Sequence, residues 1–177
     1  MTTKTRGYTL YELLITLLLV ALLSAITVPS LSASLARQRQ RAEIDALFHA
    51  VHVARKESIM RRRVVSICPS KDATTCGGNA DWSNGWLMFE NTDRDWPPHI
   101  DDGEVLIQHH AVGAETTMTA NRPGFTLRAT FLRATNGTII VCDSQSRIPA
   151  RALVISYSGR PRVATKTTGG KPYNCRN

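Results

Sequence analysis

The sequence predicts an α+β protein in which one long N-terminal helix packs on strands of an antiparallel sheet. An uncharged, strongly apolar stretch covers residues 13–31, and residues 44–54 then repeat apolar side chains at helical spacing. From Val64 onward the pattern changes to short β-branched and aromatic runs, separated by residues that favour turns. Roughly 145 residues follow the apolar stretch, which is enough for one domain with its own core.

The apolar stretch has the length of a membrane span. About 20 helical residues, rising ~1.5 Å each, cover the ~30 Å hydrocarbon core of a bilayer. Glu12 stands at its start, where an unpaired carboxylate is costly and calls for a partner. Pro29 lies inside the helical pattern and is expected to kink or loosen the helix there.

Residues 32–63 are expected to continue this helix as an amphipathic segment. One apolar face recurs at three- and four-residue spacing and comprises Ile44, Leu47, Phe48, Val51 and Ala54. We therefore expect one helix from Tyr8 to Arg62, with its second half packed on the globular domain.

Residues 64–177 are expected to form the globular, strand-rich part. The predicted strands cover residues 64–68, 85–89, 104–110, 116–120, 125–131, 138–142, 151–157 and 162–165. Asn136-Gly137 predicts a hairpin turn leading into residues 138–142. Ser158-Gly159-Arg160-Pro161 predicts the turn of the last hairpin.

Four cysteines follow the apolar stretch: Cys68, Cys76, Cys142 and Cys175. An even number indicates disulfides in an oxidising compartment, which places this part of the chain outside the cytoplasm. Three pairings are possible, and proximity in the sequence favours Cys68–Cys76 and Cys142–Cys175. A zinc site is the alternative, but these spacings lack the close ligand pairs of most zinc sites.

The net charge of +8 is concentrated near the C-terminus. Residues 1–120 carry 12 basic and 13 acidic side chains, whereas residues 121–177 carry ten basic ones and a single acid, Asp143. A basic surface of this kind indicates a polyanionic partner such as nucleic acid, acidic lipid or an acidic protein. A charge that serves only solubility remains the alternative.

The segment Gly7-Tyr8-Thr9-Leu10-Tyr11-Glu12, followed by the apolar stretch and Pro29, resembles the type III signal of type IV prepilins. The resemblance implies cleavage after Gly7 by prepilin peptidase and N-methylation of Tyr8, where phenylalanine is more usual. Glu12 would then pair with the N-terminus of a neighbouring subunit in a filament. An ordinary single-pass anchor is the alternative.

This resemblance divides the chain into a leader (1–7), a transmembrane and assembly half-helix (8–31), an amphipathic half-helix (32–63) and a periplasmic or extracellular domain (64–177). It implies a single-pass inner-membrane protein that later enters an extracellular pilus with other pilins.

Two further stretches, 65–70 (Val-Ser-Ile-Cys-Pro-Ser) and 81–89 (Asp-Trp-Ser-Asn-Gly-Trp-Leu-Met-Phe), resemble the GspH/FimT family of minor pilins and pseudopilins. With the leader, the resemblance covers most of the chain and implies the type IV pilin fold. We interpret Trp82 and Trp86 as packing residues rather than ligand contacts.

The last predicted hairpin, Tyr157-Ser158-Gly159-Arg160-Pro161-Arg162-Val163, is similar to the Gly-Arg-x-Arg motif of the FimT branch, whose members bind DNA at pilus tips during natural transformation. The resemblance points to Gly159, Arg160 and Arg162 as the DNA-binding site. A turn that exposes two guanidinium groups suits phosphate oxygens, and a solvated basic turn is the alternative. Further candidates for the same patch are Arg147, Arg151, Lys166, Lys171 and Arg176.

No sequence signature of an enzyme is evident: there is no nucleophile–base pair, phosphate-binding glycine loop or carboxylate dyad. The acidic residues of loop 91–104 offer oxygen ligands for calcium but lack EF-hand spacing, so we interpret them as a solvated loop. We predict no catalytic residue, metal or cofactor.

The sequence thus predicts a minor type IV pilin that binds DNA without sequence specificity during DNA uptake in competent cells. The first alternative is a GspH-like minor pseudopilin of a type II secretion system, with an assembly role and no DNA binding. A second is a structural tip pilin whose basic face meets an acidic partner.

Overall fold

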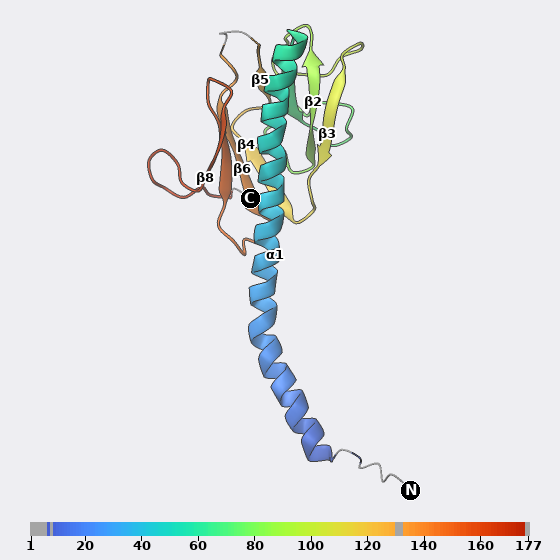
Figure 1. Ribbon diagram of the computed structural model, residues 1–177, viewed down its shortest axis with the longest axis vertical. Coiled ribbons are helices and arrows are strands. Elements are labelled where there is room, and N and C mark those ends of the chain that lie inside the picture. The colour runs from blue at the N-terminus through green and yellow to red at the C-terminus, as the bar shows by residue number, and fades with distance from the viewer. Residues whose placement is uncertain (1–6, 8, 130–132, 176–177) are drawn as a thin grey trace. The chain divides into compact units, whose positions relative to one another are not determined.

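The computed structural model describes Gly7, residues 9–129 and residues 133–175 (Figure 1). One helix, α1 (Leu10–Arg61), precedes eight strands. The strands are β1 (Val64–Pro69), β2 (Gly85–Asn91), β3 (Leu106–Ala111), β4 (Thr116–Ala120), β5 (Phe125–Leu127), β6 (Gly137–Asp143), β7 (Arg151–Ile155) and β8 (Pro161–Ala164). The predicted α+β class is confirmed. The chain divides into two compact units, Met1–Leu35 and Ala36–Asn177.

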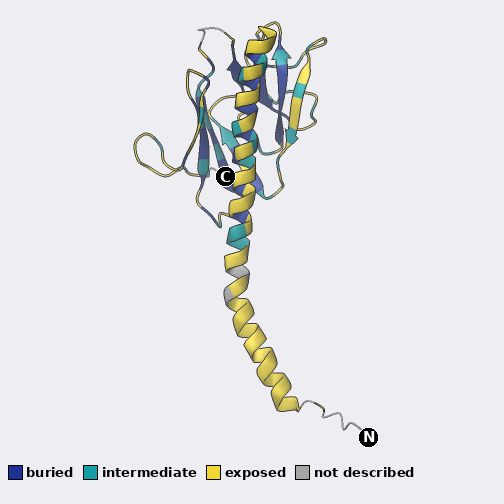
Figure 2. Ribbon diagram, in the orientation of Figure 1, coloured by how far each residue is buried: buried dark blue, intermediate teal, exposed yellow. Residues whose placement is uncertain are grey.

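The N-terminal unit presents an exposed apolar helix (Figure 2). By length and composition this part of α1 is able to cross a membrane. The helix starts with a capping box: the Thr9 N–H donates to Glu12 Oε2 (2.9 Å), and the Glu12 N–H donates to Thr9 Oγ1 (3.3 Å). Glu12 therefore also has a local role in starting the helix. The helix continues through position 29.

In the unit from Ala36 onward, the strands form two four-stranded antiparallel sheets, with strand orders β3-β2-β1-β5 and β4-β6-β7-β8. The second half of α1 lies across both (Figure 1). Ile44, Leu47, Val51 and Ala54 are buried against the sheets, and Phe48 is half-buried. This confirms the predicted apolar face.

Trp82 and Trp86 lie fully buried in the core. The Trp82 ring lies 5.5 Å from that of Phe125, between centroids, and the Trp86 ring stacks on His110 at 5.2 Å. Both indole rings are enclosed by protein, which confirms that these residues pack the core.

The predicted hairpin at Asn136-Gly137 is wrong. β5 ends at Leu127 and pairs with β1, whereas β6 begins at Gly137 in the other sheet. A two-residue hairpin turn of this type requires positive φ at both central residues, and neither residue has it. Gly137 instead allows the Asn121 side chain to approach the backbone closely, because a Cβ at position 137 would lie 2.5 Å from Asn121 Oδ1.

Two disulfides are present. Cys68 and Cys76 close a short loop after β1, and Cys142 of β6 is joined to Cys175 of the C-terminal tail. This is the pairing that proximity in the sequence favours.

Candidate nucleic-acid interface

The turn between β7 and β8 is held by a dense set of local hydrogen bonds around Ser156. The Gly159 N–H donates to the Ser156 carbonyl (2.8 Å), and the Ser156 N–H donates to the Arg160 carbonyl (3.1 Å). The Arg160 N–H in turn donates to Ser156 Oγ (3.2 Å). The Ser156 and Ser158 hydroxyls lie 2.9 Å apart. The backbone on which Arg160 stands is therefore well defined.

Gly159 allows this turn to dock against the helix. It has φ +71°, and a Cβ there would lie 2.8 Å from Arg55 Nη1 and 3.0 Å from Leu127 Cδ1. Other residues resist this backbone region. From α1, Arg55 donates to the Ser158 carbonyl. The helix thus supports the turn, a contact that the sequence motif did not indicate.

Arg160 and Arg162 are both exposed. Arg160 lies in the turn, and Arg162 lies on β8, an edge strand of its sheet, opposite Val154. Within residues 9–129 and 133–175, neither guanidinium forms an ion pair or a side-chain hydrogen bond. Two positive charges are therefore free to meet an external anion.

Arg133 and Tyr157 extend this surface. The guanidinium carbon of Arg133 lies 5.3 Å from the centre of the Tyr157 ring, a cation–π distance. The Ala134 N–H donates to the Tyr157 carbonyl (2.9 Å), which ties the two segments together. Tyr157 is 56% exposed. The structure thus adds an arginine and an aromatic ring to the candidate site.

Arg147, by contrast, lies in an ion-pair network. It contacts Asp143 at 2.6 Å and Glu115 at 2.7 Å, and Arg39 also pairs with Glu115. Hydrogen bonds from Arg147 lower the pKa of both Asp143 and Glu115, with Arg39 adding to the effect at Glu115. The charge of Arg147 is therefore offset by acids and is not free for DNA.

The network predicts a loss of stability in acid. Because the folded pKa values of Asp143 and Glu115 lie below their unfolded values of about 3.9 and 4.3, their stabilisation is present at neutral pH and is lost as the pH falls through and below that range. We expect Arg147→Met to lower Tm at pH 7 by about 5 °C, since the buried Asp143 loses its partner. Between pH 6 and pH 3, the Tm of the variant should also fall by less than the Tm of the wild type.

Thermal unfolding followed by circular dichroism across this pH range tests the network, with Arg162→Met as the matched control. Arg162 makes no ion pair among the described residues, so its variant should keep the wild-type pH profile. Equal profiles for the wild type and Arg147→Met would contradict the prediction.

The remaining sequence candidates lie at the other end of the β7–β8 hairpin. β8 runs back beside β7, so that Ala164 pairs with Ala152 and the chain leaves the sheet next to Arg151. Lys166 and Lys171 follow in the exposed tail. The basic residues that the sequence grouped around Arg160 are therefore divided between the two ends of the hairpin. Arg176 lies outside the described residues.

The acidic loop brings together the carboxylates of Asp93, Asp95 and Asp101, whose oxygens lie within 4.8 Å of one another. Two of these side chains cap the loop itself. Asp93 accepts from the Asp95 N–H (3.1 Å), and Asp95 accepts from the His99 N–H (2.7 Å). These carboxylates therefore accept hydrogen bonds from the backbone of their own loop.

Comparison with known proteins decides the family. The model of the family described as "Type II transport protein GspH" matches residues 43–159, about two thirds of the chain. This chain belongs to the GspH family. No curated protein matches it. The family is one of structural, non-enzymatic, pilin-like proteins, in agreement with the prediction of no catalytic site.

Solved structures show the same fold. Two crystal structures of the type IV minor pilin FimU from Pseudomonas aeruginosa match at 21% identity. One match covers 79% of this chain and 97% of FimU with a TM-score of 0.54; the other covers 70% and 91% with a TM-score of 0.50. The minor pseudopilin EpsH from the Vibrio cholerae type 2 secretion system matches at 9% identity, with a TM-score of 0.51 over 71% of this chain and 96% of EpsH.

The GspH match ends at Gly159, immediately before Arg160 and Arg162. The matched residues include all of the strands from β1 to β7 and both core tryptophans, Trp82 and Trp86. The two free arginines lie beyond the matched residues, so any role for them has to be argued from the turn itself.

Proposed function

We propose that this GspH-family protein is a minor type IV pilin that binds DNA through the β7–β8 turn during DNA uptake. The observation that carries the proposal is the pair of exposed arginines, Arg160 and Arg162, which have no acidic partner among the described residues and stand on a turn fixed to α1. A rigid turn reduces the conformational entropy lost when the guanidinium groups bind phosphate.

The chemistry of this surface favours the phosphate backbone. Guanidinium groups pair with phosphate oxygens through two parallel hydrogen bonds, and such contacts carry no sequence information. The exposed Tyr157 ring next to Arg133 adds a face on which an unpaired base can stack. Binding should therefore be independent of sequence and strongly dependent on salt.

The N-terminal unit would anchor the protein in the membrane and then carry the DNA-binding domain into the pilus. We propose cleavage after Gly7, N-methylation of Tyr8, retention in the inner membrane by residues 8–31, and entry into the pilus with Glu12 paired to a neighbouring subunit. The exposed apolar helix supports this role, because such a surface requires a bilayer or other helices to cover it.

A gel-shift titration with residues 36–177, the compact unit, tests DNA binding. We expect the double variant Arg160→Ala/Arg162→Ala to bind at least tenfold more weakly than the wild type at low salt. Because each lost phosphate contact removes about 0.9 from the slope of log K against log salt, the slope should fall in magnitude by about 2.

The matched control is Lys166→Ala/Lys171→Ala, which removes the same charge from the opposite end of the hairpin. This variant should keep most of the affinity. Equal losses in both double variants would indicate non-specific charge attraction and would contradict a site at the turn.

The secretion pseudopilin is the second candidate, and the likeness to EpsH together with the family description favours it. A wild-type protein that does not bind DNA at low salt would support this alternative. A purely structural tip pilin predicts that Arg160→Ala/Arg162→Ala impairs pilus assembly; assembly that continues while DNA uptake is lost would argue against it.

A further inference from the structure

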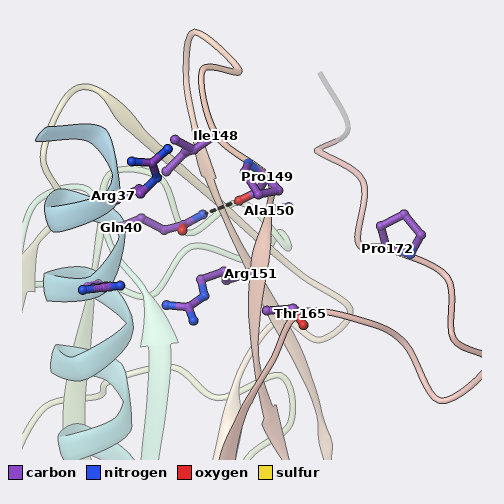
Figure 3. Close-up of a pocket in the computed structure, with 9 residues that line it drawn as sticks. Arg37, Gln40, Ile148, Pro149, Ala150, Arg151, Thr165 and Pro172 are labelled. Carbon is purple, nitrogen blue, oxygen red and sulfur yellow. Dashed lines mark hydrogen bonds between the residues drawn. The ribbon is translucent and has the colours of Figure 1, made fainter. Parts of the chain in front are cut away.

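A second basic site lies in a pocket between α1 and the start of β7 (Figure 3). Its volume is about 290 Å³. It is at the opposite end of the hairpin from the Arg160 turn, because Arg151 begins β7 and Thr165 follows β8. The lining residues are Arg37, Gln40, Arg41, Ile148, Pro149, Ala150, Arg151, Thr165 and Pro172.

Three arginines and no acid line this pocket. Arg37 and Arg41 come from α1, and the Arg151 side chain points from β7 toward the helix (Figure 3). Across the described residues, none of the three forms an ion pair or a side-chain hydrogen bond. Arg39, between the first two on the helix, is by contrast paired with Glu115. The pocket therefore gathers positive charge that the protein itself does not neutralise.

Gln40 holds the two walls of the pocket together. Its side chain is 3% exposed, and Nε2 donates to the carbonyls of Val141 and Pro149, each at 3.0 Å. These two bonds use both amide protons and fix α1 against the strands. The arginines of α1 and the arginine of β7 are thus held on the same pocket by the fold.

We propose that this pocket binds the phosphate of an anionic phospholipid headgroup. Several guanidinium groups on one pocket favour phosphate over a single carboxylate, because phosphate offers more oxygens and more charge. The volume is near the lower end of the roughly 300–1,000 Å³ of small-ligand sites, which suits a headgroup.

The position of Arg37 in the chain identifies the source of the phosphate. Arg37 follows the end of the apolar stretch, Leu31, by six residues. Even a fully extended chain of that length spans only about 20 Å. Wherever the apolar stretch is embedded in a bilayer, Arg37 stays near lipid headgroups, and basic residues next to a span are attracted to anionic lipid. This step depends on the proposed membrane anchoring.

Headgroup binding would hold this end of the globular domain at the bilayer until the subunit leaves for the filament. DNA is less suited to this pocket, because its volume is small for a polymer, whereas the Arg160 turn is exposed and offers an open surface.

Native mass spectrometry of the full chain in a zwitterionic detergent tests the proposal. With added phosphatidylglycerol, we expect a one-lipid complex that phosphatidylcholine does not give. Arg151→Gln should weaken this complex at least fivefold, and so should Arg37→Gln. The matched control, Arg162→Gln, removes the same charge from the same hairpin and should leave lipid binding unchanged.

Circular dichroism checks that each variant is folded. Equal phosphatidylglycerol binding by the wild type and both pocket variants would overturn the proposal, and so would an equal loss in Arg162→Gln. Saturation by inorganic phosphate without lipid binding would assign the pocket to free phosphate instead. Displacement of the lipid by an oligonucleotide in Arg160→Ala/Arg162→Ala would assign it to DNA. The gel shift at the turn is measured separately, so that either proposal can fail alone.

Discussion

Replacement of Cys142 and Cys175 by alanine is expected to lower the free energy of unfolding of residues 36–177 by about 4 kcal/mol. The two cysteines are 33 residues apart, and their bond joins β6 to a tail that is otherwise mostly exposed. A cross-link over that length removes many conformations from the unfolded chain, which raises the free energy of the unfolded state. The tail has few other contacts to hold it on the sheet.

The second disulfide provides the matched control. Cys68 and Cys76 are only eight residues apart. The same argument gives about 2.5 kcal/mol for their replacement by alanine. In each pair one cysteine is buried and the other half-buried, so the packing losses are similar. Urea unfolding of the two double variants measures the difference, and an equal or larger loss for the short loop would contradict the loop-length argument.

Removal of the long disulfide should lower stability without changing the proposed DNA site. Because the tail leaves β8 at the Arg151 end of the hairpin, it lies away from the Arg160 turn. The Cys142→Ala/Cys175→Ala variant should therefore keep its DNA affinity at temperatures where it remains folded. A loss of affinity in the folded variant would show that the tail takes part in binding.

The features that follow from local pattern were predictable from the sequence. The helical apolar face needs only a spacing of three and four residues, and it predicted the buried positions Ile44, Leu47, Val51 and Ala54. Most strands were located within a few residues, because β-branched runs between turn residues indicate them directly.

Features that depend on long-range pairing were not predictable. Asn136-Gly137 has the composition of a hairpin turn, but β5 pairs with β1, whereas β6 belongs to the other sheet. The contact of Arg133 with Tyr157 and the approach of Arg37 to the Arg151 wall each join segments far apart in the chain. No local spacing carries such information.

Charge counting also misjudged the basic patch. The C-terminal excess of positive charge included Arg147, which Glu115 and Asp143 neutralise. Glu115 lies in residues 1–120, whereas Arg147 lies in residues 121–177. Counting the charges of each segment separately therefore could not predict that the two side chains pair. The structure thus replaces one broad basic patch with a small free pair at the turn and a separate pocket.

Replacement of Trp82 by alanine is expected to cost about 3–5 kcal/mol, the usual range for an aromatic residue removed from a core. Trp82 joins the two sheets: its ring packs on Phe125 of β5, and its backbone N–H donates to the Met118 carbonyl of β4 (2.9 Å). Removal of the ring leaves a cavity between the sheets. The loss of unfolding free energy should therefore exceed the loss caused by removing a single methylene group from the core.

Trp82→Phe is the control that keeps an aromatic ring between the sheets and leaves the backbone hydrogen bond to Met118 in place. The indole Nε1 has no hydrogen-bond partner among the described residues, so the loss of its N–H carries no penalty. Phenylalanine fills much of the space, and we expect it to lose less than half as much stability as alanine. Chemical unfolding of both variants gives the comparison.

A DNA titration of the same variants tests what Trp82 does. If Trp82 packs the core and the turn carries binding, folded Trp82→Ala at low temperature should bind DNA as the wild type does. Reduced affinity in folded Trp82→Phe, at unchanged stability, would instead give the tryptophan a direct part in recognition. That result would move the nucleic-acid interface from the two arginines to the core around Trp82, which the complete burial of Trp82 argues against.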